Sequence, residues 1–115
     1  MNYKSNFKIV PTPPFERELK HLAKKYRSIK NDLAGLVALL QQDAFVGEEL
    51  GNDCYKIRMA ISAKNKGKSA GARLITHIHV KGPSVYLISI YDKSEQANIP
   101  YKELLQRLKN LHLIK

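Results

Sequence analysis

The strongest constraint on the fold is a set of three closely spaced stretches between residues 55 and 91 that are patterned as strands. Residues 55–61 and 73–80 alternate apolar with polar side chains, and residues 85–91 are almost continuously apolar. Alternation with period two is typical of a strand with one buried face, and a continuous apolar run is typical of a central strand. The two connections are too short for a crossover, so the three strands are predicted to form an antiparallel meander.

The rest of the chain carries mainly helical patterns. Residues 7–10 form a short apolar strand, which ends at the proline-rich run 11–14. Proline is favoured in the first turn of a helix, and apolar side chains then recur at helical spacing as far as Tyr26. Ser28 can cap a second amphipathic helix, and the leucines between residues 104 and 111 predict a third helix.

This order of elements predicts the fold class. A strand, two helices, three strands and a final helix, with Gly47 and Gly51 in the loop that leaves the second helix, indicate an α+β fold. The helical hairpin is expected to pack on one face of a twisted antiparallel sheet, which consists of the meander and the first strand. The opposite face is expected to carry the charges. Because the chain shows no repeat or linker, we expect a single domain over residues 1–115.

Positive charge gathers around the first hairpin of the meander. The basic residues there are Lys56, Arg58, Lys64, Lys66, Lys68 and Arg73. They have almost no acidic neighbours, and the whole chain has a formal net charge of +10 and a pI of about 9.8. Such a cluster repels itself, so it is most easily explained by a polyanionic partner such as RNA or DNA phosphate. A general solubility charge is the simpler alternative, whereas a basic membrane-binding helix fits less well because the cations also lie on strands and loops.

Two local motifs near this cluster give weak signals. Gly67-Lys68-Ser69 resembles the end of a phosphate-binding loop, but Ser62 stands where that motif needs its first glycine, and a strand follows instead of a helix. His77 and His79 share one strand face at a spacing that metal sites use, but no third ligand matches them. We therefore expect no metal and no cofactor, and we expect two surface imidazoles, with a contact between His77 and RNA as the alternative.

The sequence also indicates where the protein resides. The single cysteine, Cys54, excludes an internal disulfide and suits a reducing compartment. The N-terminal residues show no apolar run of the signal-peptide type, and no stretch approaches the roughly 18 apolar residues that a membrane span needs. We therefore expect a cytoplasmic protein that does not interact with a membrane.

The residue types available limit the possible chemistry. Neither a Ser/His/Asp nor a Cys/His arrangement stands out, and no pair of carboxylates sits at a strand end. Cations, hydroxyls and tyrosines suit metal-free RNA cleavage, in which the 2′-hydroxyl attacks the adjacent phosphodiester. This reaction needs a base for the hydroxyl, cations for the phosphorane and an acid for the 5′-leaving oxygen. A lysine crowded by other cations can act as the base, and an arginine fork suits the phosphorane oxygens.

Three segments carry a resemblance to a known family. They are FKIVPTPPFERELKHLAKKY, LGNDCYKIRMAISAKNKGKSAGARLI and VYLISIYDKSE, and the elements YKIR, KGKSAGAR and IYDKSE form a specific combination within them. Together they resemble the RelE/ParE superfamily of bacterial toxins from type II toxin–antitoxin modules, most closely its HigB/RelE branch. The resemblance implies a ribosome-dependent mRNA endonuclease, which enters the ribosomal A site, cleaves the codon there and is inhibited by a cognate antitoxin wrapped around it.

The resemblance also implies roles for individual residues. The family's catalytic lysines fall near Lys56 and Arg58, and its phosphate-binding arginine falls on Arg73. A basic residue after the last strand falls at or beside Lys93, and the family's C-terminal tyrosine has a match in Tyr101. Further contacts with nucleic acid are expected from Lys64, Lys66, Lys68, His77 and Tyr91.

Departures from the family pattern keep two alternatives open. Ser94 stands where the RelE branch has an arginine, and Arg58 stands where a second lysine would be. One alternative is a ParE-like inhibitor of DNA gyrase, which needs no nuclease site, and the other is an inactive member that binds only RNA or its antitoxin. The net charge of +10 predicts an acidic antitoxin segment that folds over the basic face. Without a long unburied apolar stripe, the free protein is expected to be a monomer.

Overall fold

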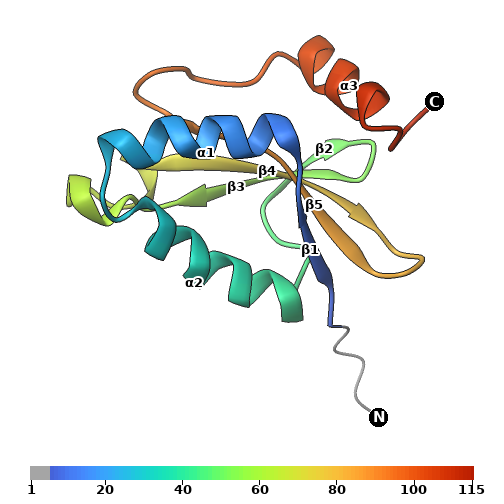
Figure 1. The fold of residues 1–115 in the computed structure, drawn as a ribbon, viewed down its shortest axis with the longest axis horizontal. Helices are drawn as coiled ribbons and strands as arrows, with labels where there is room; N and C mark the ends of the chain where they lie inside the picture. The colour runs from blue at the N-terminus through green and yellow to red at the C-terminus, as the bar shows by residue number, and fades with distance from the viewer. Residues whose placement is uncertain (1–5) are drawn as a thin grey trace.

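The computed structural model describes residues 6–115 and is shown in Figure 1. Its strands are β1 (Lys8–Pro11), β2 (Glu48–Gly51), β3 (Cys54–Met59), β4 (Ala72–His79) and β5 (Ser84–Asp92). Its α-helices are α1 (Pro13–Lys25), α2 (Ile29–Gln42) and α3 (Tyr101–Asn110), and two 3₁₀ turns, Ser62–Lys64 and Lys68–Ala70, lie between β3 and β4. Residues 1–5, part of the segment that showed no apolar leader, lie outside the described residues. The predicted α+β fold, with an N-terminal strand, a helical hairpin and a C-terminal helix, is confirmed.

The five strands form one sheet in the order β1-β5-β4-β3-β2. Strands β3, β4 and β5 pair antiparallel, which confirms the predicted meander. Strand β1 runs parallel to β5, so the sheet is mixed and not antiparallel throughout. A parallel pair needs a long connection between its strands, and here the helical hairpin and the other strands lie between β1 and β5 in the chain.

Strand β2 forms where the sequence predicted a loop. Gly47 precedes this four-residue strand and Gly51 ends it, with positive φ angles of +97° and +91°. A Cβ atom on Gly47 would collide with the backbone of Lys56, so the close approach of this segment to β3 requires glycine. The pairing matters for the site because it sets Glu48 directly opposite Lys56.

Helices α1 and α2 cover one face of the sheet, as Figure 1 shows. Their fully buried side chains, such as Phe15 and Leu22, pack with strand residues such as Leu74 and Ile90 in the main core. Helix α1 begins at Pro13, as the proline-rich run predicted, and Glu16 in its first turn suits the positive end of the helix dipole. The helical hairpin therefore leaves the other face of the sheet available.

That other face is divided between an apolar and a charged part. Helix α3 and the segment before it cover the apolar part, where Ile75, Ile88, Leu104 and Leu108 form a second cluster. The charged part lies around Arg73, near the start of β4, where Lys56, Arg58 and Lys93 line the same cleft. The C-terminal helix thus limits how much of the face a partner can reach.

Two kinds of feature are absent from the described part of the chain. No helix between residues 6 and 115 is both long and apolar enough to cross a bilayer. Among the same residues, no group of three or more His, Cys, Asp or Glu side chains is placed to hold a metal ion.

Candidate active site

A cleft with a volume of about 670 Å³ lies at the charged part of the sheet. The residues that line it are Gly47, Glu48, Lys56, Arg58, Arg73, Lys93, Ala97 and Asn98. Four of the five predicted catalytic residues are among them, and only Tyr101 is not. They come from segments far apart in the sequence, so the fold brings together most of the site that the sequence predicted.

Strand register explains how the cations meet. Arg58 and Arg73 are paired directly across β3 and β4, and Lys56 lies two residues before Arg58 on the same strand. Paired residues, and residues two apart on a strand, point to the same face of a sheet. Lys93 directly follows β5, and its N–H donates to the Gly71 carbonyl oxygen at 3.0 Å, which ties the end of β5 to the start of β4.

Arg73 is a buried cation that the fold holds in a fixed orientation. The residue is only 5% exposed, yet its side chain lines the cleft. Its guanidinium donates to the carbonyl oxygens of Lys68 at 3.1 Å, Ala72 at 3.1 Å and Ser69 at 3.4 Å. Within residues 6–115, no carboxylate lies within ion-pair distance of it. Neutral carbonyls orient this charge without cancelling it, so the site favours an anion.

Lys56 has two partners inside the cleft that the sequence analysis did not identify. Its ammonium lies 3.6 Å from Glu48 Oε1 and donates to Asn98 Oδ1 at 3.0 Å. Glu48 was missed because β2 was not recognised as a strand. Pairing residues 48–51 with β3 would have placed this glutamate opposite Lys56. The cleft therefore contains a carboxylate beside its cations.

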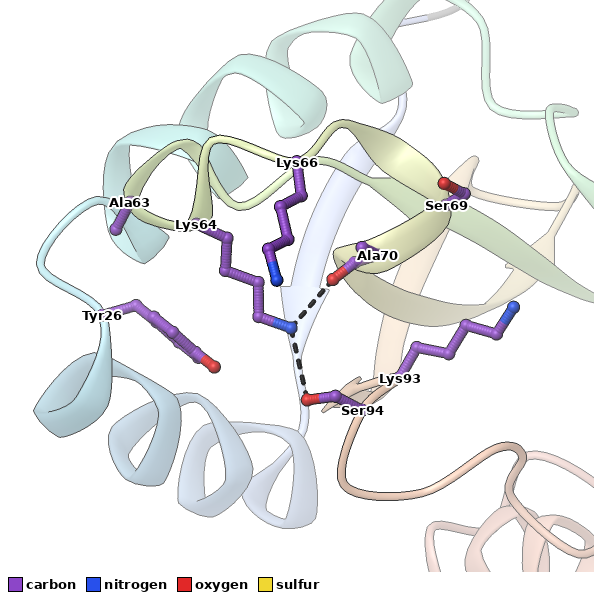
Figure 2. Close-up of a pocket in the computed structure, with 8 residues that line it drawn as sticks. All are labelled: Tyr26, Ala63, Lys64, Lys66, Ser69, Ala70, Lys93 and Ser94. Atoms are coloured by element: carbon purple, nitrogen blue, oxygen red, sulfur yellow. Dashed lines mark hydrogen bonds between the residues drawn. The ribbon is translucent and has the colours of Figure 1, made fainter.

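Lys64 fixes the loop between β3 and β4, and Figure 2 shows its ammonium hydrogen-bonded to Ala70 and Ser94. The Lys64 ammonium donates to Asp92 Oδ1 at 2.7 Å and to the Ala70 carbonyl oxygen at 2.8 Å. The Asp92 side chain is fully buried, and that of Lys64 is 13% exposed. Burial alone would raise the pKa of this carboxyl, but hydrogen bonds from Lys64, Tyr26 and Ser94 outweigh it and hold the pKa well below its usual range. The charge of Lys64, predicted to contact nucleic acid, is therefore used within the fold.

A second anchor fixes the beginning of the same loop. Both the N–H and the hydroxyl of Ser62 donate to the carboxylate of Asp32 on α2, at 2.9 and 2.5 Å. Burial alone would raise the pKa of Asp32, but the hydrogen bonds from Ser62 and Ser28 lower it overall. At the far end, a Cβ on Gly71 would collide with the backbone of Met59. The loop therefore contains two 3₁₀ turns that are held at several points.

Two other lysines of this loop remain exposed. Lys66 and Lys68 are exposed, and neither makes an ion pair with any residue that the structure describes. The carbonyl oxygen of Lys68 accepts from Arg73, so the backbone of this residue supports the site while its side chain faces solvent. Their contact with nucleic acid stays a prediction.

Two predicted nucleic-acid contacts are buried and need correction. His77 is 3% exposed, and its Nδ1 lies 3.6 Å from the buried thiol of Cys54. Tyr91 is 4% exposed, and its hydroxyl has no hydrogen-bond partner within the described residues. Burial lowers the pKa of His77 and raises that of Tyr91. Tyr91 packs with Ile99 and the leucines of α3, and His77 lies beside Cys54, so neither side chain is available to stack on a base.

Tyr101 lies apart from the cleft. It is 49% exposed at the start of α3, and its hydroxyl accepts a hydrogen bond from Asn52 Nδ2 at 2.7 Å. Asn52 lies in the turn between β2 and β3, at the end of β2 away from Glu48. The tyrosine thus contacts the β2–β3 turn and not the cations of the cleft.

Comparisons with known proteins bear on the fold. No protein-family model and no curated protein matches the sequence. A solved structure of the E. coli toxin RelE, a double arginine-to-alanine mutant in the free state, matches with a TM-score of 0.62 and 21% identity over 90% of this chain and 98% of that one. The isolated E. coli RelE toxin matches with a TM-score of 0.55 and 20% identity over 89% of this chain and 98% of the other. The HigB branch stays a prediction, and the chain has the fold of the RelE toxin.

Proposed function

We propose that this protein is the toxin of a type II toxin–antitoxin module and cleaves mRNA in the ribosomal A site. The observation that carries the proposal is Arg73, a buried and fixed guanidinium without a carboxylate partner among residues 6–115, in a cleft that also contains Lys56, Arg58 and Lys93. A phosphodiester supplies the anion that this arrangement favours. The RelE-like fold and the sequence resemblance support the same function.

In the proposed reaction, the 2′-hydroxyl of the substrate attacks the adjacent phosphorus without a metal ion. Arg73 and Arg58 bind the non-bridging oxygens and stabilise the charge that develops on the phosphorane. Lys56, whose side chain also lines the cleft, helps to hold the phosphate.

Proton transfer in this mechanism uses two residues that line the cleft, Glu48 and Lys93. Glu48, the carboxylate among the cleft residues, accepts the proton of the 2′-hydroxyl. The bond from phosphorus to the 5′-oxygen then breaks, which leaves a 2′,3′-cyclic phosphate, and the exposed ammonium of Lys93 donates the proton that the leaving oxygen needs. Solvent exchange restores both groups for the next substrate.

Primer extension on a reporter mRNA after brief induction tests the proposal. The wild type is expected to produce cuts within translated codons, whereas Arg73→Ala is expected to produce none. Arg27→Ala removes an exposed arginine outside the cleft and is the matched control, with cuts expected to persist. Growth arrest without cuts would favour gyrase inhibition, and no arrest by the folded wild type would favour an inactive binder.

A second pair of variants tests the role of the carboxylate. Glu48→Gln is expected to lower the single-turnover cleavage rate by roughly 10²–10⁴-fold, the usual contribution of a general base. Glu49→Gln is the matched control, because Glu49 is the next residue on β2 and accepts a hydrogen bond from the Tyr55 hydroxyl instead of lining the cleft. Equal rates for the two variants would exclude Glu48 as the base.

The proposed antitoxin is an acidic segment that covers the basic face. The net charge of +10 supports this partner, since complementary charge steers association and holds the bound segment. We expect the purified toxin–antitoxin complex to dissociate more readily as the salt concentration rises, because salt screens exposed charges. A dissociation constant that does not change with salt would contradict electrostatic masking of the site.

A further inference from the structure

A second pocket, with a volume of about 590 Å³, lies between the end of α1, the loop after β3 and the end of β5 (Figure 2). The residues that line it are Tyr26, Ala63, Lys64, Lys66, Ser69, Ala70, Lys93 and Ser94. Only Lys93 is shared with the candidate active site. The volume falls within the usual range for pockets that hold small organic ligands.

The lining of this pocket combines apolar walls with cationic edges. The Tyr26 ring, the methyl groups of Ala63 and Ala70 and the lysine stems supply apolar surface. Figure 2 shows the Lys66 side chain pointing into the pocket, and its ammonium has no ion-pair partner within the part of the chain that the structure describes. Ser69 adds a hydroxyl that can donate or accept a hydrogen bond. A ligand with a flat apolar part and a negative charge fits this combination best.

The walls of the pocket are fixed before any ligand arrives. The Tyr26 hydroxyl donates to Asp92 Oδ2 at 2.6 Å, which orients the ring. Asp92 also accepts from Lys64, and Lys64 in turn donates to the Ala70 carbonyl oxygen, so two opposite walls share one buried network. A preformed pocket binds with a smaller loss of side-chain entropy and can discriminate between ligands of similar size.

Lys93 connects this pocket with the cleft that contains Arg73. Figure 2 shows the Lys93 side chain directed away from Tyr26, so an extended ligand bound along Lys93 would pass from one site to the other. We propose that the pocket binds the nucleotide next to the scissile phosphate of a single-stranded RNA, an inference that rests on the proposed function. The base lies against the apolar surface beside Tyr26 and Ala63, and its phosphate contacts Lys66. The Lys64 ammonium, 5.6 Å from the Tyr26 ring centroid, adds a cation at this wall.

Binding of mononucleotides tests this assignment without requiring cleavage. The probes are the four nucleoside 5′-monophosphates and inorganic phosphate, titrated into ¹⁵N-labelled protein. Nucleotides are expected to shift the amide signals of Ser69, Ala70 and Ser94, whereas inorganic phosphate shifts signals around the cleft. Ala63→Trp places an indole at the pocket, and Ala97→Trp places one at the cleft; both alanines are exposed. Because the indole fills the space that the base needs, we expect Ala63→Trp to weaken nucleotide binding by roughly tenfold, about what one stacked base contributes, while phosphate binding at the cleft is retained.

The opposite results would overturn the assignment. One such result is that nucleotides shift only the amide signals around Arg73 in the cleft. The other is that Ala63→Trp, with an unchanged melting temperature, changes the nucleotide affinity by less than about twofold. If Ala63→Trp does not fold, the nucleotide affinity of Lys66→Glu is compared with that of the wild type instead. Lys81→Glu, at an exposed lysine outside both sites, is the charge-matched control. A protein that binds nucleotides in this pocket but leaves mRNA intact would refute the proposed nuclease and support the pocket.

Discussion

Replacing Asp92 by asparagine tests the buried ion pair that holds the loop after β3. The carboxylate is fully buried and accepts hydrogen bonds from Lys64 at 2.7 Å and Tyr26 at 2.6 Å. Asparagine keeps the size of the side chain but removes the charge that balances the Lys64 ammonium. Breaking a buried pair in this way costs about 3–5 kcal/mol, and we expect about 3 kcal/mol because the Ala70 carbonyl oxygen still accepts from Lys64.

Urea and thermal unfolding, followed by circular dichroism, measure this loss. For a chain of 115 residues, 3 kcal/mol corresponds to a fall in the melting temperature of about 12 °C. The pKa of Asp92 is lower in the folded than in the unfolded state, so its contribution is fully present above the unfolded value, near 3.8, and is lost as the pH falls toward the folded value. The difference in unfolding free energy between the wild type and Asp92→Asn should therefore shrink below about pH 4.

A double-mutant cycle separates the ion pair from other effects of the substitution. Lys64→Met removes the nearer cation and leaves the carboxylate with Lys25 at 3.9 Å and the Tyr26 hydroxyl, whereas the double variant removes both charges of the close pair. We expect the double variant to lose about 1–3 kcal/mol less free energy of unfolding than the two single variants lose in sum. A cost of Asp92→Asn below about 1 kcal/mol, or an additive cycle, would refute the reasoning.

Three further predictions concern single residues. Gly35→Ala is expected to raise the unfolding free energy by about 0.5–1 kcal/mol in urea titrations, because a Cβ at this position in α2 meets no atom within 4 Å. Gly71→Ala is expected to lower it by about 2 kcal/mol in the same assay, because a Cβ there collides with the Met59 backbone; equal effects of the two substitutions would contradict the geometry. Burial raises the pKa of the Cys54 thiol to about 12, so iodoacetamide should alkylate it only under denaturing conditions, and rapid labelling of the native protein would show that it is accessible.

The elements that the sequence predicted are those whose signal is local. Period-two alternation extends over most of β3 and β4, and proline marks the start of α1 at Pro13. Strand β2, Glu48–Gly51, is too short for alternation to be recognised, and it forms only because Gly47 allows a close approach to β3. Whether β1 pairs parallel or antiparallel with β5 depends on how the long connection between them packs. The residues near β1 do not indicate which direction is adopted.

The site shows the same division between local and tertiary information. Alternation along the strands correctly placed Lys56, Arg58 and Arg73 on one face. The same rule placed His77 on one strand face with Arg73, but it could not show that this imidazole is buried beside Cys54. Burial by a distant element is a result of packing, so residues that share a strand face can still differ in their access to a ligand.

Net charge alone does not identify the surface that binds a partner, because the fold uses cations in two ways. Those with carboxylate partners are Lys25, Lys56, Lys64 and Arg107. Arg58, Arg73 and Lys93 have no ion pair within residues 6–115, and all three line one cleft. Burying Arg73 without a counter-charge is costly for a folded protein unless a ligand supplies the charge, since neutral carbonyls recover only part of the lost hydration. The position of this uncompensated charge, and not the total of +10, is what points to a phosphate at this site.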